Sequence, residues 1–359
     1  MKNYFQKKFQ SFFPNVLGLI LGLSLCLVLT KVAGENPVHV LQVLLQSSFG
    51  SNYDLGLTLF YTSCFIFTGL SVCIAFHAGM FNIGAEGQLL MGAMSTAAVG
   101  ILAGSLPTPV LWSLMFFIPL LVSAGWGAIA GALKAYRQSH EVIVTMMMNF
   151  VAAGLTSFLT LYVFKNPESQ NPETPNLPNL AILDTWDPMK KIFPDSAVGW
   201  PFLLAIFAAL SLHFFLKDSR LGFRLKATGQ NPEAAKLAGI QVARMQILGM
   251  AMAGALAGCV GFAEVWASSH KFKMGFSADY GFIGIAVALL ARNHPLSILL
   301  SALLFGVLHK GASSLDLETE HITRDFSKIL QSVIILSVIA VGTWDLLKQK
   351  RKGKTHGIS

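Results

Sequence analysis

Charged side chains are scarce in this sequence. Asp, Glu, Lys and Arg make up 12% of its 359 residues, whereas hydrophobic residues make up 53%. A soluble domain usually carries about 25% charged residues, so the composition excludes an ordinary water-soluble globular protein. Several apolar runs reach the ~20 residues that a helix needs to cross the hydrocarbon core of a bilayer. The sequence therefore predicts a polytopic membrane protein.

The sequence also lacks the short motifs of common enzymatic chemistry. It contains no G-x-x-x-x-G-K-[ST] phosphate loop, no H-E-x-x-H motif and no G-x-S-x-G elbow. Its four cysteines lie in apolar stretches without C-x-x-C or Cys/His spacing, and we expect them to be buried small hydrophobes. No catalytic residue and no metal site are predicted, and any ATP hydrolysis must occur on another subunit. The four cysteines are Cys26, Cys64, Cys73 and Cys259.

Apolar runs alternate with short polar connections, which predicts an all-α helical bundle of about 8–10 transmembrane helices. Basic residues concentrate in alternate connections, so the net charge of +8 indicates membrane orientation and not nucleic-acid binding. The positive-inside rule then places both termini in the cytoplasm. The eighth and ninth spans are short enough to be half-helices, and an acidic outer loop with Asp316, Glu318 and Glu320 is expected after the ninth. The expected spans are about 12–32, 55–77, 81–102, 110–133, 142–164, 200–216, 246–266, 276–291, 296–309 and 329–347.

The longest polar stretch with a strong positive bias covers residues 217–246. Near its middle, an Asn-Pro pair predicts the end of one helix, because proline bars the helical conformation from the residue before it. Proline and glutamate suit the first turn of the next helix, and a glycine ends that helix after small side chains. Such a helix fits a groove on another protein, although a solvated loop that orients the chain by its charge also explains the pattern. The residues concerned are Gly229, Asn231, Pro232, Glu233, Ala234, Ala235 and Gly239.

A second informative stretch, residues 79–93, places polar side chains in an apolar run. Glu86 is expected about a turn and a half into a span, and a charge at the centre of a bilayer costs about 2.5–3.5 kcal/mol. Its carboxyl must therefore face protein or a water-filled cavity, or be protonated. Asn82 lies four residues earlier and would share a helix face with Glu86. Two interpretations stay open, a buried polar clamp that fixes helix packing and the lining of a translocation path. The candidate path residues are Asn82, Glu86, Gln88 and Asn149.

The stretch 165–198 contains six prolines and more acids than bases, which predicts an outward loop or cap. We expect residues 1–359 to form one transmembrane domain, with 217–246 and 165–198 as its two distinctive connections.

Three motifs resemble those of ABC importer permease subunits in the branched-chain amino acid/ribose/nucleoside permease family. Residues 229–240 read G-x-N-P-x-A-A-x-x-A-G-I and resemble the family's cytoplasmic coupling loop, which docks on the ATP-hydrolysing subunit. Residues 81–93 read F-N-I-G-x-E-G-Q-L-x-x-G-A and resemble the nucleoside branch, which works with binding lipoproteins of the basic-membrane-protein type. Residues 140–143 resemble the family's N-E-V-I block, with His140 in place of the usual Asn.

The resemblance implies a multi-pass protein of the cell (inner) membrane with two internally related halves, and not an enzyme. It implies import of nucleosides that an extracytoplasmic solute-binding lipoprotein delivers. A cytoplasmic ATPase subunit would use ATP and Mg²⁺, and no cofactor would bind this chain. Because importers use two coupling loops and this chain offers one, a second permease subunit is implied, with a heterodimer favoured and a homodimer possible.

Three alternatives to nucleoside import by an ABC permease stay open. Riboflavin and simple sugars are alternative substrates, since close relatives of these motifs serve them. An ATP-independent secondary transporter is the alternative of another class, and it would not need residues 229–240.

Overall fold

The structure is a computed structural model that describes residues 17, 18, 20–182, 187–277, 279–319, 322, 329, 330, 332–334, 336, 337, 340 and 341. Within these residues the regular secondary structure is helical, and one isolated antiparallel bridge joins Glu173 to Lys273. The chain forms two compact units: unit 1 comprises Met1–Asp54 and Val307–Ser359, and unit 2 comprises Leu55–Gly306. The all-α fold class is confirmed, whereas the single domain stays a prediction.

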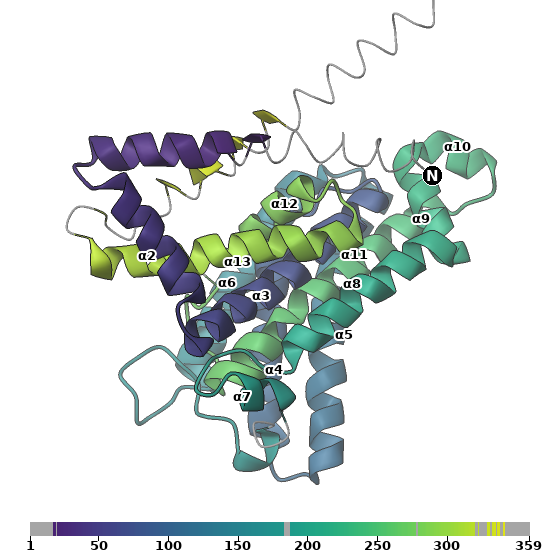
Figure 1. Ribbon diagram of the computed structural model, residues 1–359. Coiled ribbons are helices and arrows are strands. Elements are labelled where there is room, and N and C mark those ends of the chain that lie inside the picture. Colours follow the sequence, from purple (N-terminus) through teal and green to yellow (C-terminus); the bar gives the residue numbers. More distant parts are fainter. Residues whose placement is uncertain are drawn as a thin grey trace, which may run out of the picture. The chain divides into compact units, whose positions relative to one another are not determined.

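Figure 1 shows the helices, which the chain forms one after another. Two π-helical segments, η1 and η4, continue or follow α-helices, and η2 is a single 3₁₀ turn. The order is α2 (Pro37–Phe49), α3 (Asn52–His77), α4 (Ala85–Leu102), α5 (Thr108–Arg137), α6 (Glu141–Phe158), η1 (Leu159–Val163), η2 (Asn179–Ala181), α7 (Pro188–Ile192), α8 (Pro201–Asp218), α9 (Arg220–Gln230), α10 (Pro232–Leu237), α11 (Val242–Gly258), η4 (Phe262–Ser269), α12 (Tyr280–Leu290) and α13 (Pro295–Glu318).

Six of the described helices are long and apolar enough to cross a membrane. A shorter apolar helix, Ile20–Val32, precedes them, and α12 is also short. At 1.5 Å per residue, the 11 residues of α12 span about 16 Å, roughly half of a ~30 Å hydrocarbon core. The six candidate spans are Asn52–His77, Thr108–Arg137, Glu141–Val163, Pro201–Asp218, Val242–Ser269 and Pro295–Asp316.

The end of α13 differs from the expectation. The half-helix interpretation is consistent with α12 but wrong for α13, which has 24 residues and continues to Glu318. Asp316 and Glu318 therefore lie in the last turn of α13 and not in an acidic loop. Glu320, the start of the first expected span and most of the last one lie outside the described residues.

Unit 1 contains α2 and the second half of α13. Within it, the Ser48 hydroxyl donates to the Val307 carbonyl at 3.0 Å, and the Lys310 ammonium pairs with Asp54 at 3.3 Å. The Cys26 thiol donates to the Leu330 carbonyl at 3.2 Å. All four cysteines are free and buried, as predicted.

In unit 2, small residues let helices pack backbone to backbone. A Cβ atom built on Gly92 of α4 would lie 2.5 Å from the Cα atom of Gly258 in α11, and one on Gly131 of α5 would lie 2.9 Å from the Cα atom of Ile247 in α11. Close approach of this kind is the usual means of helix association in lipid, where the hydrophobic effect does not drive helices together. The packed helices α4, α5 and α11 form the frame that holds the polar residues described below.

The connection between α3 and α4 corrects another expectation. The third span was expected to begin near Phe81, but α4 begins at Ala85. Gly79 adopts the left-handed conformation with φ +72°, and the Asn82 side chain accepts a hydrogen bond from the Gly84 N–H group at 3.0 Å. Such side-chain to backbone bonds compete with helix formation. Asn82 therefore does not share a helix face with Glu86, and Glu86 lies in the first turn of α4.

Candidate functional site

The short helix predicted after Asn231 is present as α10. The Asn231 side chain accepts a hydrogen bond from the Ala234 N–H group at 3.1 Å, which caps the helix, and Pro232 occupies its first turn beside Glu233. Gly239 adopts φ +77°, a left-handed conformation that ends the helix and favours glycine. The predicted local structure of residues 231–239 is thus confirmed, while their coupling role stays a prediction.

One face of α10 is apolar and exposed. Ala234 and Leu237 of α10 and its C-cap residue Ala238 follow i, i+3, i+4 spacing and so lie on one side of the helix, and Leu237 is 91% exposed. Ala235 points the other way and is only 4% exposed, so it packs against this chain and does not belong to the exposed face. The sequence pattern had suggested Ala234 and Ala235 together, whereas Leu237, which the helical spacing from Ala234 identifies, was not predicted.

Gly229, three residues before α10 begins, lies in close backbone contact with Gly79, the first residue of the stretch 79–93. A Cβ atom built on Gly229, near the end of α9, would lie 2.8 Å from the backbone nitrogen of Gly79. A Cβ atom built on Gly79 would in turn lie 3.0 Å from the Cα atom of Gly229. Neither position tolerates a larger residue without a shift. A displacement of Gly229 toward Gly79 would therefore push against the backbone of the α3–α4 connection.

The α3–α4 connection leads into a buried cluster of amides. The Asn82 amide nitrogen donates to the Ser71 hydroxyl at 3.1 Å and to the Gln88 side-chain oxygen at 2.9 Å. The Asn82 oxygen accepts from the Gln88 amide nitrogen at 3.2 Å and from the Gly84 N–H group at 3.0 Å. An Asn side chain offers two donors and two lone pairs, so these four bonds use its full capacity. We call Ser71, Asn82 and Gln88 the amide cluster.

The other two candidates, Glu86 and Asn149, line a cavity of about 320 Å³ in unit 2, which we call the Glu86 cavity. Asn82 and Gln88 are not among the described residues that line it. The four candidates therefore divide into two pairs. The lining residues are Glu86, Leu90, Met146, Asn149, Phe150, Ala153, Thr156, Ser157, Phe272, Met274, Gly275, Ser277 and Phe282.

The polar groups of the Glu86 cavity are held in place by other helices. The Ser277 hydroxyl and the Gly281 N–H group each donate to one oxygen of the Glu86 carboxyl, the latter at 2.7 Å. Gly281 lies in the first turn of α12, so the carboxyl lies at a helix N-terminus, where negative charge is stabilised. Asn149 of α6 accepts from the Gly87 N–H group at 2.8 Å and donates to the Ile83 carbonyl at 3.0 Å. Both side chains are therefore preorganised.

A second carboxyl, that of Glu264, lies near the same end of α12 and was missed in the sequence analysis. It belongs to η4, is 9% exposed and forms a hydrogen bond with the Tyr280 hydroxyl. Two acids from different helices thus contact the first turn of α12, which indicates that this short helix is fixed at its N-terminus. Glu264 is an acid within an apolar run of the sequence, and this feature could have identified it as a candidate.

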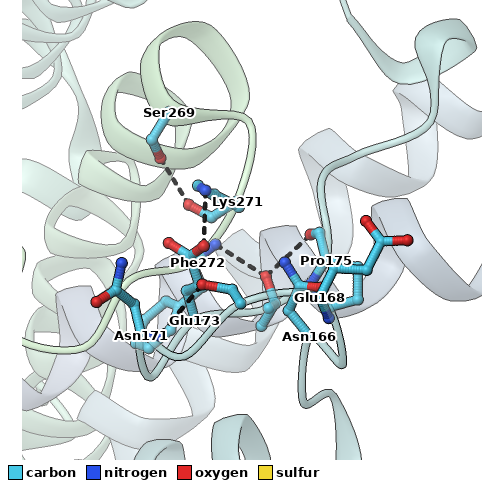
Figure 2. A network of polar contacts seen from close by, with 10 residues as sticks. Asn166, Glu168, Asn171, Glu173, Pro175, Ser269, Lys271 and Phe272 are labelled. Atoms are coloured by element: carbon cyan, nitrogen blue, oxygen red, sulfur yellow. Dashed lines mark hydrogen bonds and ion pairs between the residues drawn. The ribbon is translucent and has the colours of Figure 1, made fainter.

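Residues 270–277 connect η4 to α12 and supply one wall of the Glu86 cavity. Residues 165–198, which we call the proline-rich loop, hold this segment by hydrogen bonds of backbone and side chains, which Figure 2 shows. The Thr174 N–H group donates to the Phe272 carbonyl at 3.0 Å, and the Phe272 N–H group donates to the Thr174 hydroxyl at 3.0 Å. The Lys271 ammonium donates to Glu173 at 2.8 Å, which holds the pKa of that carboxyl below its ordinary value. The proline-rich loop therefore determines where Phe272 lies.

The proline-rich loop and α10 lie at opposite ends of unit 2 (Figure 1). The start of α4 follows the connection that touches Gly229, whereas Gly100, near the other end of α4, contacts Leu177 of the loop. The 18 residues of α4 separate these ends by about 27 Å. This arrangement fits the expectation that the two connections lie on opposite sides of the membrane.

The branched-chain amino acid transport system permease-component family matches residues 55–339. The nucleoside ABC transporter permease protein NupB of Lactococcus lactis subsp. cremoris is 31% identical over 342 residues, which cover 94% of this chain and 93% of NupB. The guanosine ABC transporter permease protein NupP of Bacillus subtilis is 32% identical, with coverage of 90% and 91%. The glucose ABC transporter permease protein TsgB13 of Haloferax volcanii is 31% identical, with coverage of 94% and 89%.

Proposed function

Since this chain belongs to the family of branched-chain amino acid transport system permease components, we propose that it is the permease subunit of an ATP-driven nucleoside importer. It is a multi-pass protein of the cell membrane and a component of a transport system rather than an enzyme. Two of the similar proteins carry names that specify nucleosides or guanosine. A glucose permease is similar to the same extent, so a sugar is the second candidate substrate.

The observation that carries the coupling role is the exposed apolar face of α10. A capped helix of six residues that presents Ala234, Leu237 and Ala238 to the exterior fits a groove on a partner protein. We propose that this partner is a separate cytoplasmic ATPase subunit that uses ATP and Mg²⁺, and that this chain binds no cofactor. The solute would arrive from an extracytoplasmic binding lipoprotein at the proline-rich loop.

The Gly229–Gly79 contact supports a route by which the ATPase acts on the membrane helices. A movement of α10 displaces the end of α9, and Gly229 leaves no space before the backbone of the α3–α4 connection. That connection leads through the amide cluster into the first turn of α4, which carries Glu86. Access would then alternate by a shift between packed helices. A second permease subunit would supply the other coupling helix, and we favour a heterodimer over a homodimer.

The test is to replace Leu237 with Asp in the full complex and to compare it with Leu102→Asp. Leu102 is 74% exposed and lies at the opposite end of α4, so it offers a matched exposed leucine away from α10. Loss of an apolar anchor at an interface typically costs about 2 kcal/mol, roughly thirtyfold in affinity. We expect Leu237→Asp to abolish co-purification of the ATPase and ATP-dependent uptake of labelled guanosine, with normal membrane insertion.

The control Leu102→Asp should keep both the ATPase and uptake. If Leu237→Asp also keeps them, α10 is not the coupling helix. If the wild-type chain takes up guanosine without an ATPase, the secondary-transporter alternative is correct. Uptake of glucose instead of guanosine would retain the coupling role and change the substrate.

A further inference from the structure

Resting on the proposed nucleoside transport, we infer that the Glu86 cavity is a solute-binding site that recognises a planar heterocycle joined to a vicinal diol. The heterocycle lies against phenyl rings of Phe150 and Phe282, and the diol donates to the Glu86 carboxyl. This assignment goes beyond a translocation path, because it names the residues that select a nucleoside over a simple sugar.

The size and lining of the cavity fit a small ligand with two chemically different parts. Its volume of about 320 Å³ lies at the lower end of the range of roughly 300–1,000 Å³ that is usual for small-molecule sites. Most of its lining is apolar or aromatic, and the polar groups are few. They are the Glu86 carboxyl, the Asn149 amide and the hydroxyls of Thr156, Ser157 and Ser277.

The polar groups retain capacity for a ligand after their internal bonds are counted. The two oxygens of the Glu86 carboxyl offer about four acceptor sites, and Ser277 and Gly281 use two of them. The Asn149 amide keeps one donor and one lone pair after its bonds to Gly87 and Ile83. A carboxylate with two free acceptor sites matches the two hydroxyl donors of a ribose, whereas Asn82 has no remaining capacity.

The aromatic rings supply the second part of the site. Phe150 is 68% exposed, Phe282 is 39% exposed and both line the cavity, whereas Phe272, which also lines it, is buried. Stacking of a base on an aromatic side chain is worth roughly tenfold or more in affinity and does not depend on the identity of the base. Phe150 is anchored on α6 next to Asn149, and Phe282 on α12 next to Gly281.

A hexose suits this cavity poorly. Its hydroxyl groups surround the whole edge of the ring, so those directed away from Glu86 and Asn149, toward the methionines and the other apolar lining, would be desolvated without partners. A nucleoside has one flat face of low polarity and one hydroxyl-rich end. The distribution of polar groups therefore favours the nucleoside and disfavours the sugar.

The test is photolabelling of the complete transporter in lipid nanodiscs with 8-azidoguanosine, followed by peptide mapping. We expect label in residues 146–157 or 272–282, protection by guanosine, and no protection by glucose. Phe150→Ala should weaken protection by guanosine roughly tenfold, and Phe150→Trp should retain it. The matched control is Phe158→Ala, because Phe158 is also exposed on α6, at 54%, but does not line the cavity.

Three results would each overturn the site. The first is label outside both segments, and the second is protection by glucose equal to that by guanosine. The third is an equal loss of protection by guanosine in Phe150→Ala and Phe158→Ala. Uptake by the same complexes separates this failure from that of the proposed function. If wild-type complexes import guanosine with ATP and Phe150→Ala imports it equally well, the site is wrong and the function stands. If wild-type complexes import glucose but no guanosine, the proposed substrate and the site both fail.

Discussion

The amide cluster and the Glu86 cavity differ in how much hydrogen-bonding capacity they leave free. Asn82, Gln88 and Glu86 lie within seven consecutive residues, yet they face different surroundings. Asn82 is 0% exposed and makes four hydrogen bonds inside the protein. Glu86 makes two and faces a cavity. The difference arises because Asn82 precedes the helix, whereas Glu86 lies on it and points away from Gln88.

This comparison separates the two interpretations that the sequence left open. A buried polar clamp describes the amide cluster, since a fully satisfied network stabilises one arrangement of the chain and has nothing left to bind. A ligand-facing role for Glu86 and Asn149, which line the cavity, stays a prediction. The comparison predicts that stability and ligand binding respond to different residues of the same motif.

The largest effect is expected for Asn82→Ala. This change leaves the Gln88 amide, the Ser71 hydroxyl and the Gly84 N–H group without their partner in a buried place. Each unsatisfied group costs about 1–3 kcal/mol, so we expect the free energy of unfolding to fall by about 3 kcal/mol or more. Thermal unfolding of the detergent-solubilised protein measures this. Protection of the folded molecules by guanosine against 8-azidoguanosine labelling should change little, and a large loss of protection with unaltered stability would contradict the division.

A somewhat smaller effect is expected for Gly229→Ala, which tests the contact between α9 and the α3–α4 connection. The added Cβ atom would meet the Gly79 backbone, and overpacking of this kind costs about 1–3 kcal/mol. The matched control is Gly125→Ala in α5, where a built Cβ atom has no neighbour within 4 Å. The control should be neutral or stabilising, because alanine favours a helix by about 1 kcal/mol.

We expect Gly229→Ala to reduce guanosine uptake more than ATP hydrolysis, so that the number of ATP molecules used per solute rises. That ratio, measured in proteoliposomes, is the informative quantity. An unchanged ratio would mean that the Gly229–Gly79 contact serves packing alone.

Glu86→Gln should impair uptake more than stability, whereas Asn82→Ala should mainly lower stability. Gln keeps an oxygen that accepts from Ser277, but it loses the charge that suits the N-terminus of α12 and the two-oxygen acceptor that suits a diol. We expect uptake per inserted molecule to fall about tenfold, which corresponds to ~1.4 kcal/mol, with a smaller loss of stability. Labelled guanosine uptake normalised to membrane content measures this, and Ser277→Ala provides a milder comparison. An effect on stability larger than that of Asn82→Ala would reverse the assignment.

Much of the fold could be predicted because it follows from local rules. Length and hydropathy predict the membrane helices, and proline, glycine and asparagine chemistry predicts α10 with its cap and its end. The start of α4 could not be predicted in the same way. The apolar run continues through Phe81, and the competing bond from Gly84 to Asn82 becomes apparent only in the structure.

The sequence also could not predict that the four candidate residues divide into the amide cluster and the Glu86 cavity. Nothing in the spacing of Asn82, Glu86 and Gln88 indicates that Ser277 and Gly281, almost two hundred residues later, bind Glu86. Likewise, the burial of Ala235 depends on how α10 lies against the rest of unit 2. The partners of Glu86 and the burial of Ala235 depend on contacts between segments far apart in the chain, and such contacts cannot be inferred from a single sequence.

The smallest effect is expected at the other end of segment 270–277, where Glu173 accepts from Lys271. Because the folded pKa of Glu173 is lowered, its contribution to stability is present above the unfolded pKa of about 4.3 and is lost as the pH falls through the folded pKa. A partly exposed pair contributes no more than about 1 kcal/mol. Glu173→Gln should therefore unfold slightly more easily than wild type at pH 7, and the difference should vanish as the pH falls below 4.

Glu168→Gln, a change to an exposed acid of the same loop, is the control, and thermal unfolding at both pH values is the measurement. A difference that persists at low pH would mean that Glu173 positions the Phe272 wall of the Glu86 cavity by its shape and not by its charge.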